Sequence, residues 1–163
     1  MLHVKVFTFS PIQENTYLLY NAEKECVIID PGCYFDEEKE TLKAFIQQKE
    51  LTPVMLLNTH CHLDHVFGNK WVHEKFGLEL YLHSYEEKVL EVAELSGEKW
   101  GMPFENYNGP LHFLEEGDTV FLGTDELKVI EAPGHSPGHI CFYSAKQNFL
   151  IGGDVLFQRS IGR

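Results

Sequence analysis

The chain has 163 residues, of which 44% are hydrophobic and 13% aromatic, which is enough for one domain with a buried core and excludes a disordered chain. Its formal net charge of -12, from 25 acidic and 13 basic residues, argues against nucleic acid or an anionic membrane surface as the main partner. Neither a secretory signal nor an apolar run of about 18 residues is present, so we expect a cytoplasmic protein.

The first part of the chain predicts three strands followed by a helix. Residues 4–9 and 16–20 alternate apolar and polar side chains, which predicts an antiparallel pair. Residues 26–29 form a short apolar run closed by Asp30-Pro31-Gly32, which indicates a buried strand that ends in a turn. Residues 36–50 carry acidic side chains in the first turn and apolar ones at helical spacing, so we predict an amphipathic helix there.

The rest of the chain alternates strands with helices and then returns to strands. A predicted strand over residues 53–57 precedes a helix over 69–76, which Gly77 ends, and a strand over 78–82. Ser84 as N-cap and Glu87 at the capping-box position predict a further helix that reaches about residue 95. A stretch rich in glycine and proline follows and is interpreted as a loop. Four short strands are predicted after it, over residues 119–122, 127–130, 139–143 and 148–151.

One segment after the strand at 53–57 concentrates metal-binding side chains, in the order Thr59-His60-Cys61-His62-Leu63-Asp64-His65. Zinc and similar divalent ions prefer imidazole nitrogen and carboxylate oxygen. His60 and His62 project from the same side of an extended backbone, because side chains alternate with a period of two, while Asp64 and His65 follow on the turn. Cys61 points away from them and is interpreted as a small buried residue. The segment indicates ligands for two adjacent ions; the alternative is a histidine-rich surface turn that binds metal adventitiously.

Two later turns supply further ligand candidates at predicted strand ends. His135 lies in the turn PGHSPGH, and Asp154 follows two glycines that permit close backbone approach. Together with the first segment they predict a dinuclear metal site. Asp30 has two interpretations: a carboxylate that caps its own turn, or an acceptor that orients a metal ligand. The four cysteines show neither a CxxC spacing nor a dense disulfide framework, so we predict reduced thiols.

These motifs, THxHxDH, PGHSPGH and GGDVLF, resemble in order and spacing those of the metallo-β-lactamase-fold hydrolases, and most of all the glyoxalase II-like thiolesterases. Asn15-Thr16-Tyr17 and residues 27–32 are also similar to that family, so the resemblance covers essentially the whole chain. It implies that His139 is structural or orients a ligand. One subclass of broad-spectrum β-lactamases carries cysteine at the position of Asp154, which points away from that activity. The ligand set that the resemblance implies is His60, His62 and His135 on a first metal, Asp64 and His65 on a second, and Asp154 bridging both.

The resemblance also implies the fold. We expect an α+β protein, an αββα sandwich of two sheets flanked by helices, in a single domain over residues 1–163. Members of the family usually continue for several further elements and bring a last histidine to the second metal, whereas this sequence stops at Arg163. We therefore expect a C-terminally truncated domain with an incomplete second half, either a fragment or a protomer completed by another chain, and a homo-oligomer stays open. Arg163 falls where glutathione thiolesterases carry a basic residue that contacts glutathione, so it is a candidate substrate-binding residue.

The predicted activity is hydrolysis by metal-activated water of a small-molecule thioester or ester of the acylglutathione kind. Asp64 is the candidate catalytic residue, because it would orient the water and take its proton. Zinc is the expected cofactor, as one or two ions, with iron or manganese as alternatives. Two other functions stay open: a mononuclear iron persulfide dioxygenase and, from another class, a catalytically silent metal-binding module.

Overall fold

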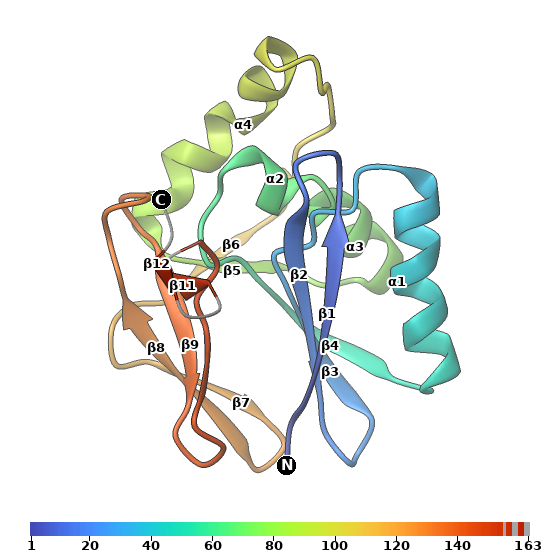
Figure 1. Cartoon of the computed structure of the whole chain (residues 1–163), viewed down its shortest axis with the longest axis vertical. Coiled ribbons are helices and arrows are strands. Elements are labelled where there is room, and N and C mark those ends of the chain that lie inside the picture. Colours follow the sequence, from blue (N-terminus) through green and yellow to red (C-terminus); the bar gives the residue numbers. More distant parts are fainter. Residues whose placement is uncertain (155, 158–159, 162–163) are drawn as a thin grey trace.

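A six-stranded sheet forms the centre of the molecule (Figure 1). The computed structural model describes residues 1–154, 156–157 and 160–161. The first three strands pair antiparallel, and pairing is parallel from the third strand onward. The strands lie in sequence order: β1 (His3–Phe9), β2 (Glu14–Tyr20), β3 (Glu25–Ile29), β4 (Thr52–Leu57), β5 (Leu80–Leu82) and β6 (Leu111–Phe113).

A second, antiparallel sheet of four strands lies beside the first (orange in Figure 1). Its order is β10-β9-β8-β7, which is a simple meander because neighbours in the chain are neighbours in the sheet. The strands are β7 (Thr119–Leu122), β8 (Asp125–Glu131), β9 (Ile140–Ser144) and β10 (Phe149–Ile151). Beyond them, the two-residue strands β11 (Leu156–Phe157) and β12 (Ser160–Ile161) pair with each other.

The helices lie in the connections between the parallel strands, because a parallel pair needs a crossover. In Figure 1, α1 stands on the side of the first sheet that faces away from the second sheet. The helical segments are α1 (Asp36–Gln48), α2 (Leu63–Val66), α3 (Asn69–Phe76), the 3₁₀ turn η1 (Ser84–Glu86) and α4 (Glu87–Lys99). In the described part of the chain we find no helix with the length and apolar character needed to cross a membrane.

The first sheet is buried on both faces, because alternate residues of a strand point to opposite sides. Leu56 of β4 belongs to a core cluster with Leu42 of α1. Its neighbour Leu57 belongs to a second cluster, with Val129 and Phe142 of the second sheet. The molecule therefore has a helix layer and two sheet layers with one apolar core on each side of the first sheet, which confirms the sandwich predicted from the sequence.

The start of α4 differs from the sequence prediction. Ser84 is not the N-cap of an α-helix, since it begins the 3₁₀ turn η1. The cap of that turn is His83, whose Nδ1 accepts a hydrogen bond from the N–H of Tyr85 at 3.0 Å. α4 then runs to Lys99, beyond the predicted end. The capping-box prediction is wrong because the His83 imidazole supplies the acceptor that we assigned to a serine hydroxyl.

Several strands also differ from prediction: β2 begins at Glu14 and not at residue 16, and β8 spans Asp125–Glu131 and not 127–130. β5 begins at Leu80 and not at residue 78. β6 was missed, because only three residues form it and they directly follow Gly109-Pro110, a pair that indicates a turn. β6 pairs with β5, and no local sequence pattern predicts this tertiary contact.

The two-sided core predicts a large effect of truncating Leu56, which is fully buried. We expect Leu56→Ala to lower the free energy of unfolding by about 2–5 kcal/mol, as is usual for Leu to Ala changes in cores. Urea denaturation of the metal-free protein measures this free energy of unfolding. Val54→Ala on the same strand is the control: Val54 is 41% exposed, so its truncation should cost only about 0.5 kcal/mol. Equal losses in the two variants would contradict the assignment of Leu56 to the core.

Candidate metal centre

The ends of strands from both sheets bring the predicted ligands to one place. β4 ends at Leu57, and the segment with His60 and His62 follows it directly. His135 lies in the loop between β8 and β9, and Asp154 lies just after β10. The main chain joins the two sheets here, because the N–H of Ile140 donates to the carbonyl of Thr59 at 2.9 Å.

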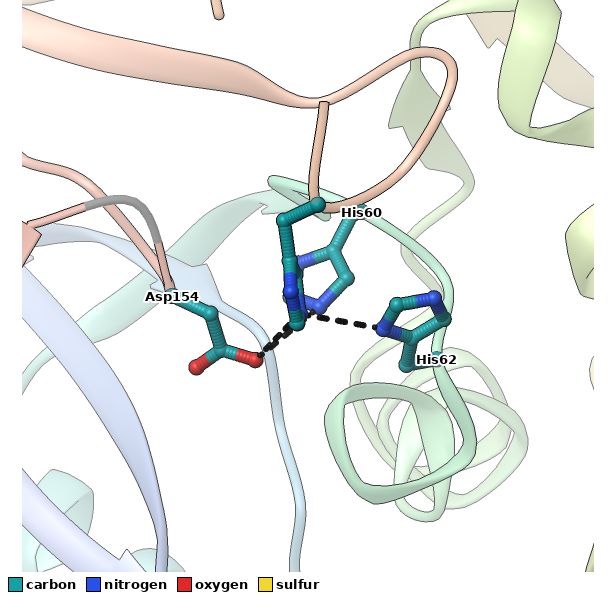
Figure 2. A group of neighbouring side chains, drawn as sticks. His60, His62 and Asp154 are labelled. Carbon is teal, nitrogen blue, oxygen red and sulfur yellow. Dashed lines mark hydrogen bonds and ion pairs between the residues drawn. The ribbon is translucent and has the colours of Figure 1, made fainter. Parts of the chain in front are cut away.

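A first cluster consists of His60, His62, His135 and Asp154, each of which offers one ligand atom within 4.8 Å of the others. Nδ1 of His62 lies 3.1 Å from Nε2 of His135, which in turn lies 2.9 Å from Oδ2 of Asp154. Nε2 of His60 lies 3.3 Å from the same Asp154 oxygen. Figure 2 shows the side chains of His60, His62 and Asp154 pointing toward one another.

A second cluster consists of Asp64, His65 and Asp154. Nε2 of His65 lies 3.2 Å from Oδ2 of Asp154 and 3.5 Å from Oδ2 of Asp64. Asp64 and His65 are on the one-turn helix α2, which replaces the simple turn predicted there. Because Oδ2 of Asp154 belongs to both clusters, its carboxylate has the position that a ligand bridging two ions needs.

Thr59 orients the imidazole of His60. The Thr59 hydroxyl donates its proton to Oδ2 of Asp30 at 2.5 Å and lies 3.0 Å from Nδ1 of His60. Since a hydroxyl has only one proton, Nδ1 of His60 must be the donor in the second contact, which leaves the lone pair on Nε2. Nε2 is buried and makes no hydrogen bond to any described residue. A buried nitrogen lone pair that faces other donor atoms fits a metal ligand.

Asp30 orients a ligand and does not merely cap its turn. Its Oδ1 accepts from the N–H of Thr59 at 2.7 Å, and its Oδ2 lies 2.9 Å from Nδ1 of His65. The residue is fully buried and has a φ of +54°, in the left-handed region that non-glycine residues seldom adopt. Such strain is typical of sites where the surrounding contacts determine the backbone. Of the two interpretations of Asp30, the geometry selects the acceptor that holds His65.

Gly153 allows the approach of Asp154. Its φ is +59°, and an added Cβ would lie 2.5 Å from Oγ1 of Thr59 and 3.0 Å from Nε2 of His139. A side chain is therefore excluded both by conformation and by space. His139 is buried, its ring stacks on that of His60 at a centroid distance of 4.6 Å, and its Nε2 lies 2.8 Å from the carbonyl of Gly152. These contacts support the structural role expected for His139.

Burial keeps His60 and His62 neutral. Burial lowers the pKa of His60 to about 3. Burial, and then the nearby imidazole of His135, also lowers the pKa of His62. Metal binding requires the neutral imidazole, so these two side chains are in the binding form at neutral pH.

The second cluster has the opposite electrostatics. Burial alone would lower the pKa of His65, but the carboxylates of Asp30 and Asp154 outweigh it and raise that pKa well above its usual value. Burial would raise the pKa of Asp154, but the imidazoles of His60 and His65 outweigh it and hold that pKa well below its usual range. Burial raises the pKa of Asp64. The metal-free second cluster is therefore a network of charged hydrogen bonds around a protonated His65.

One predicted site residue lies outside the described residues, and one buried carboxyl beside the site was not predicted. Arg163 lies outside the described residues, and its proposed contact with substrate stays a prediction. Glu14, by contrast, was missed: its carboxyl is buried, burial raises its pKa well above the usual value, and its Oε1 lies 3.6 Å from Nδ1 of His65. Glu14 lies before the strand predicted over residues 16–20, whereas β2 begins at Glu14 itself.

The fold and this arrangement of histidines and aspartates define a class of protein. The model of the metallo-beta-lactamase superfamily matches residues 10–163, and the chain belongs to that family. The resemblance inferred from the three motifs is thereby confirmed.

Three known proteins illustrate the relationship. The chain is 32% identical over 164 residues to the hydroxyacylglutathione hydrolase GloC of Haemophilus influenzae and covers 99% of its own length and 76% of that protein. Its fold is similar to the solved structure of TTHA1623 in a di-iron-bound form, with a TM-score of 0.86, 39% identity and coverage of 98% of this chain and 76% of that one. It is also similar to BLEG-1, described as a B3 metallo-beta-lactamase, with a TM-score of 0.85, 38% identity and coverage of 100% and 76%.

The contrast between the two clusters predicts that their affinities for zinc depend differently on pH. Zinc must displace a proton from His65, so affinity at the second cluster should rise about tenfold per pH unit until the raised pKa of His65 is passed. The first cluster should show much weaker dependence, because the pKa values of His60 and His62 are lowered. Calorimetric zinc titrations at several pH values, in buffers of different ionisation enthalpy, measure affinity and proton release together. Identical pH dependence of both binding events would contradict this assignment.

Proposed function

We propose that this protein is a metal-dependent hydrolase of thioesters or esters, with an acylglutathione as the model substrate. The observation that carries the proposal is the single oxygen of Asp154 that belongs to both ligand clusters. His60, His62 and His135 would hold one ion, Asp64 and His65 a second, with Asp154 between them. Similarity to GloC supports the choice of a thioester.

When bound, such ions lower the pKa of a water molecule from about 15.7 toward about 7 and polarise a carbonyl oxygen. The chain supplies the rest of the chemistry. Asp64, whose side chain is 15% exposed, accepts the proton of the attacking water. Water oxygen bonds to the carbonyl carbon, the bond from carbon to sulfur breaks, and the proton leaves with the thiol. Cys61 is unsuited as a nucleophile, because burial raises its thiol pKa well above the usual value.

The zinc-loaded, iron-loaded and manganese-loaded proteins should be assayed side by side. We expect thiol release from an acylglutathione and no persulfide-dependent oxygen uptake. A cephalosporin belongs in the same series, because of the similarity to BLEG-1. Oxygen uptake without thiol release, with one iron per chain, would instead favour the mononuclear persulfide dioxygenase. Tight metal binding without turnover of any of these substrates would favour the silent metal-binding module.

Removing one ligand should abolish turnover and leave the fold intact. We expect His62→Ala to lower kcat/KM for the acylglutathione by more than about 100-fold, since loss of a ligand's supporting partner alone costs about 10–100-fold. His62 lies on a loop and is only partly buried, so circular dichroism and thermal unfolding of the metal-free form should change little. His112→Ala is the control, because the His112 side chain is 42% exposed and contacts Glu79 at 2.8 Å, away from the ligand clusters. Unchanged turnover in metal-replete His62→Ala would contradict the proposal.

A further inference from the structure

A buried carboxylate outside the ligand clusters connects the two loops that carry the histidines. Glu86 is the last residue of η1 and is fully buried. Its Oε1 accepts hydrogen bonds from the N–H of Cys61 at 2.7 Å and from the hydroxyl of Ser136 at 2.8 Å. Its Oε2 accepts from the N–H of Gly138 at 2.8 Å and lies at the same distance from the Ser136 hydroxyl.

Each of these donors is next to a candidate ligand or in its loop. Cys61 stands between His60 and His62, and Ser136 directly follows His135. We propose that Glu86 is a positioning residue that holds the β4–α2 loop and the β8–β9 loop at the spacing the first cluster needs to bind metal. This role rests on the metal centre of the proposed function.

The part of the β8–β9 loop around His135 depends on such a contact, because its own main-chain hydrogen bonds are long. A main-chain hydrogen bond of 2.8 Å from Ala132 to His139 closes the base of the loop, but the bonds nearer His135, from Gly134 to Ser136 and from His139 to Ser136, are both long at 3.3 Å. Gly134, directly before His135, has a φ of +141°, a conformation that residues with a side chain rarely adopt. An added Cβ on Gly138 would lie 3.0 Å from Cγ and from the backbone nitrogen of Glu86, so the loop packs directly against η1.

The chemistry requires a carboxylate. Glu86 accepts from both loops with both oxygens, and an ionised carboxylate is acceptor-only. A glutamine has one acceptor oxygen, and its amide group is a donor. In Glu86→Gln that donor would face the N–H of either Cys61 or Gly138, so one of the two loops would lose its main-chain hydrogen bond to residue 86.

Another glutamate provides a matched control. Glu38 also accepts from backbone N–H groups of two segments, those of Ser10, Tyr34 and Phe35, but it contacts neither histidine-bearing loop. Glu38→Gln makes the same change in charge and removes comparable hydrogen bonds. A role of Glu86 in stability alone predicts that the two variants behave alike.

The experiment measures zinc affinity of the metal-free proteins by competition with a chromophoric chelator, together with the absorption spectrum of the cobalt(II) forms. We expect Glu86→Gln to weaken the tighter zinc site about 10–100-fold, the range typical of residues that orient ligands, and to change the cobalt spectrum. Glu38→Gln should match the wild type in both measurements. Thermal unfolding of the metal-free forms measures the loss of stability in each variant; Glu86 is fully buried and Glu38 only partly, so the loss should be larger in Glu86→Gln.

A second variant leaves the charge of Glu86 in place. Ser136→Ala combined with Gly138→Ala removes the hydroxyl donor and pushes the loop away from Glu86, so it should also weaken zinc binding. This variant carries the test if Glu86→Gln does not fold. Wild-type zinc affinity in the double variant would show that Glu86 acts by charge alone. Equal zinc affinities in Glu86→Gln and Glu38→Gln would show a merely structural role. Either result overturns the proposal. Absence of zinc binding in the wild type would instead overturn the metal centre itself.

Discussion

The contact on which the site depends is the one between Oδ2 of Asp154 and three imidazoles. That oxygen lies within 3.3 Å of nitrogens of His60, His65 and His135, which come from two segments, the one that follows β4 and the β8–β9 loop. Asp154 follows the second sheet and His60 follows the first, so the cluster forms only when the two sheets are packed together. Assembly of the ligands is therefore coupled to the core between the sheets, and metal binding should stabilise that packing.

Placing so many titratable groups in a buried region is costly unless each finds a partner. Most of these partners are residues that surround the two ligand clusters and hold the candidate ligands in place. Asp30 holds Thr59 and His65, and Thr59 in turn holds His60. Among the described residues, three buried side-chain atoms have no hydrogen-bond partner, and all are at this site: Oε1 of Glu14, Nε2 of His60 and Nδ1 of His139. Of these three atoms, Nε2 of His60 belongs to a candidate ligand, and an unpaired buried nitrogen there fits a role in metal binding.

The two clusters differ in how readily they accept metal, because the surrounding charges differ. The first consists mainly of neutral imidazoles whose pKa values are lowered by burial. The second contains a histidine that carboxylates keep protonated. This asymmetry gives a physical reason for unequal binding of two ions within one family fold, independent of which metal the protein uses.

The sequence by itself determined the family, the order of most strands and helices, and the segments that carry the candidate ligands. It could do so because alternation, helical spacing and the motif around His60 are local patterns. Only the tertiary structure decided that one oxygen of Asp154 serves both clusters, that Asp30 holds His65, and that Glu14 and Glu86 are buried beside the site. These contacts join residues far apart in the chain, such as Glu86 and Ser136. These contacts depend on how the two sheets and the β8–β9 loop pack against each other. Such packing produces no periodic pattern in the sequence, so the sequence alone does not predict it.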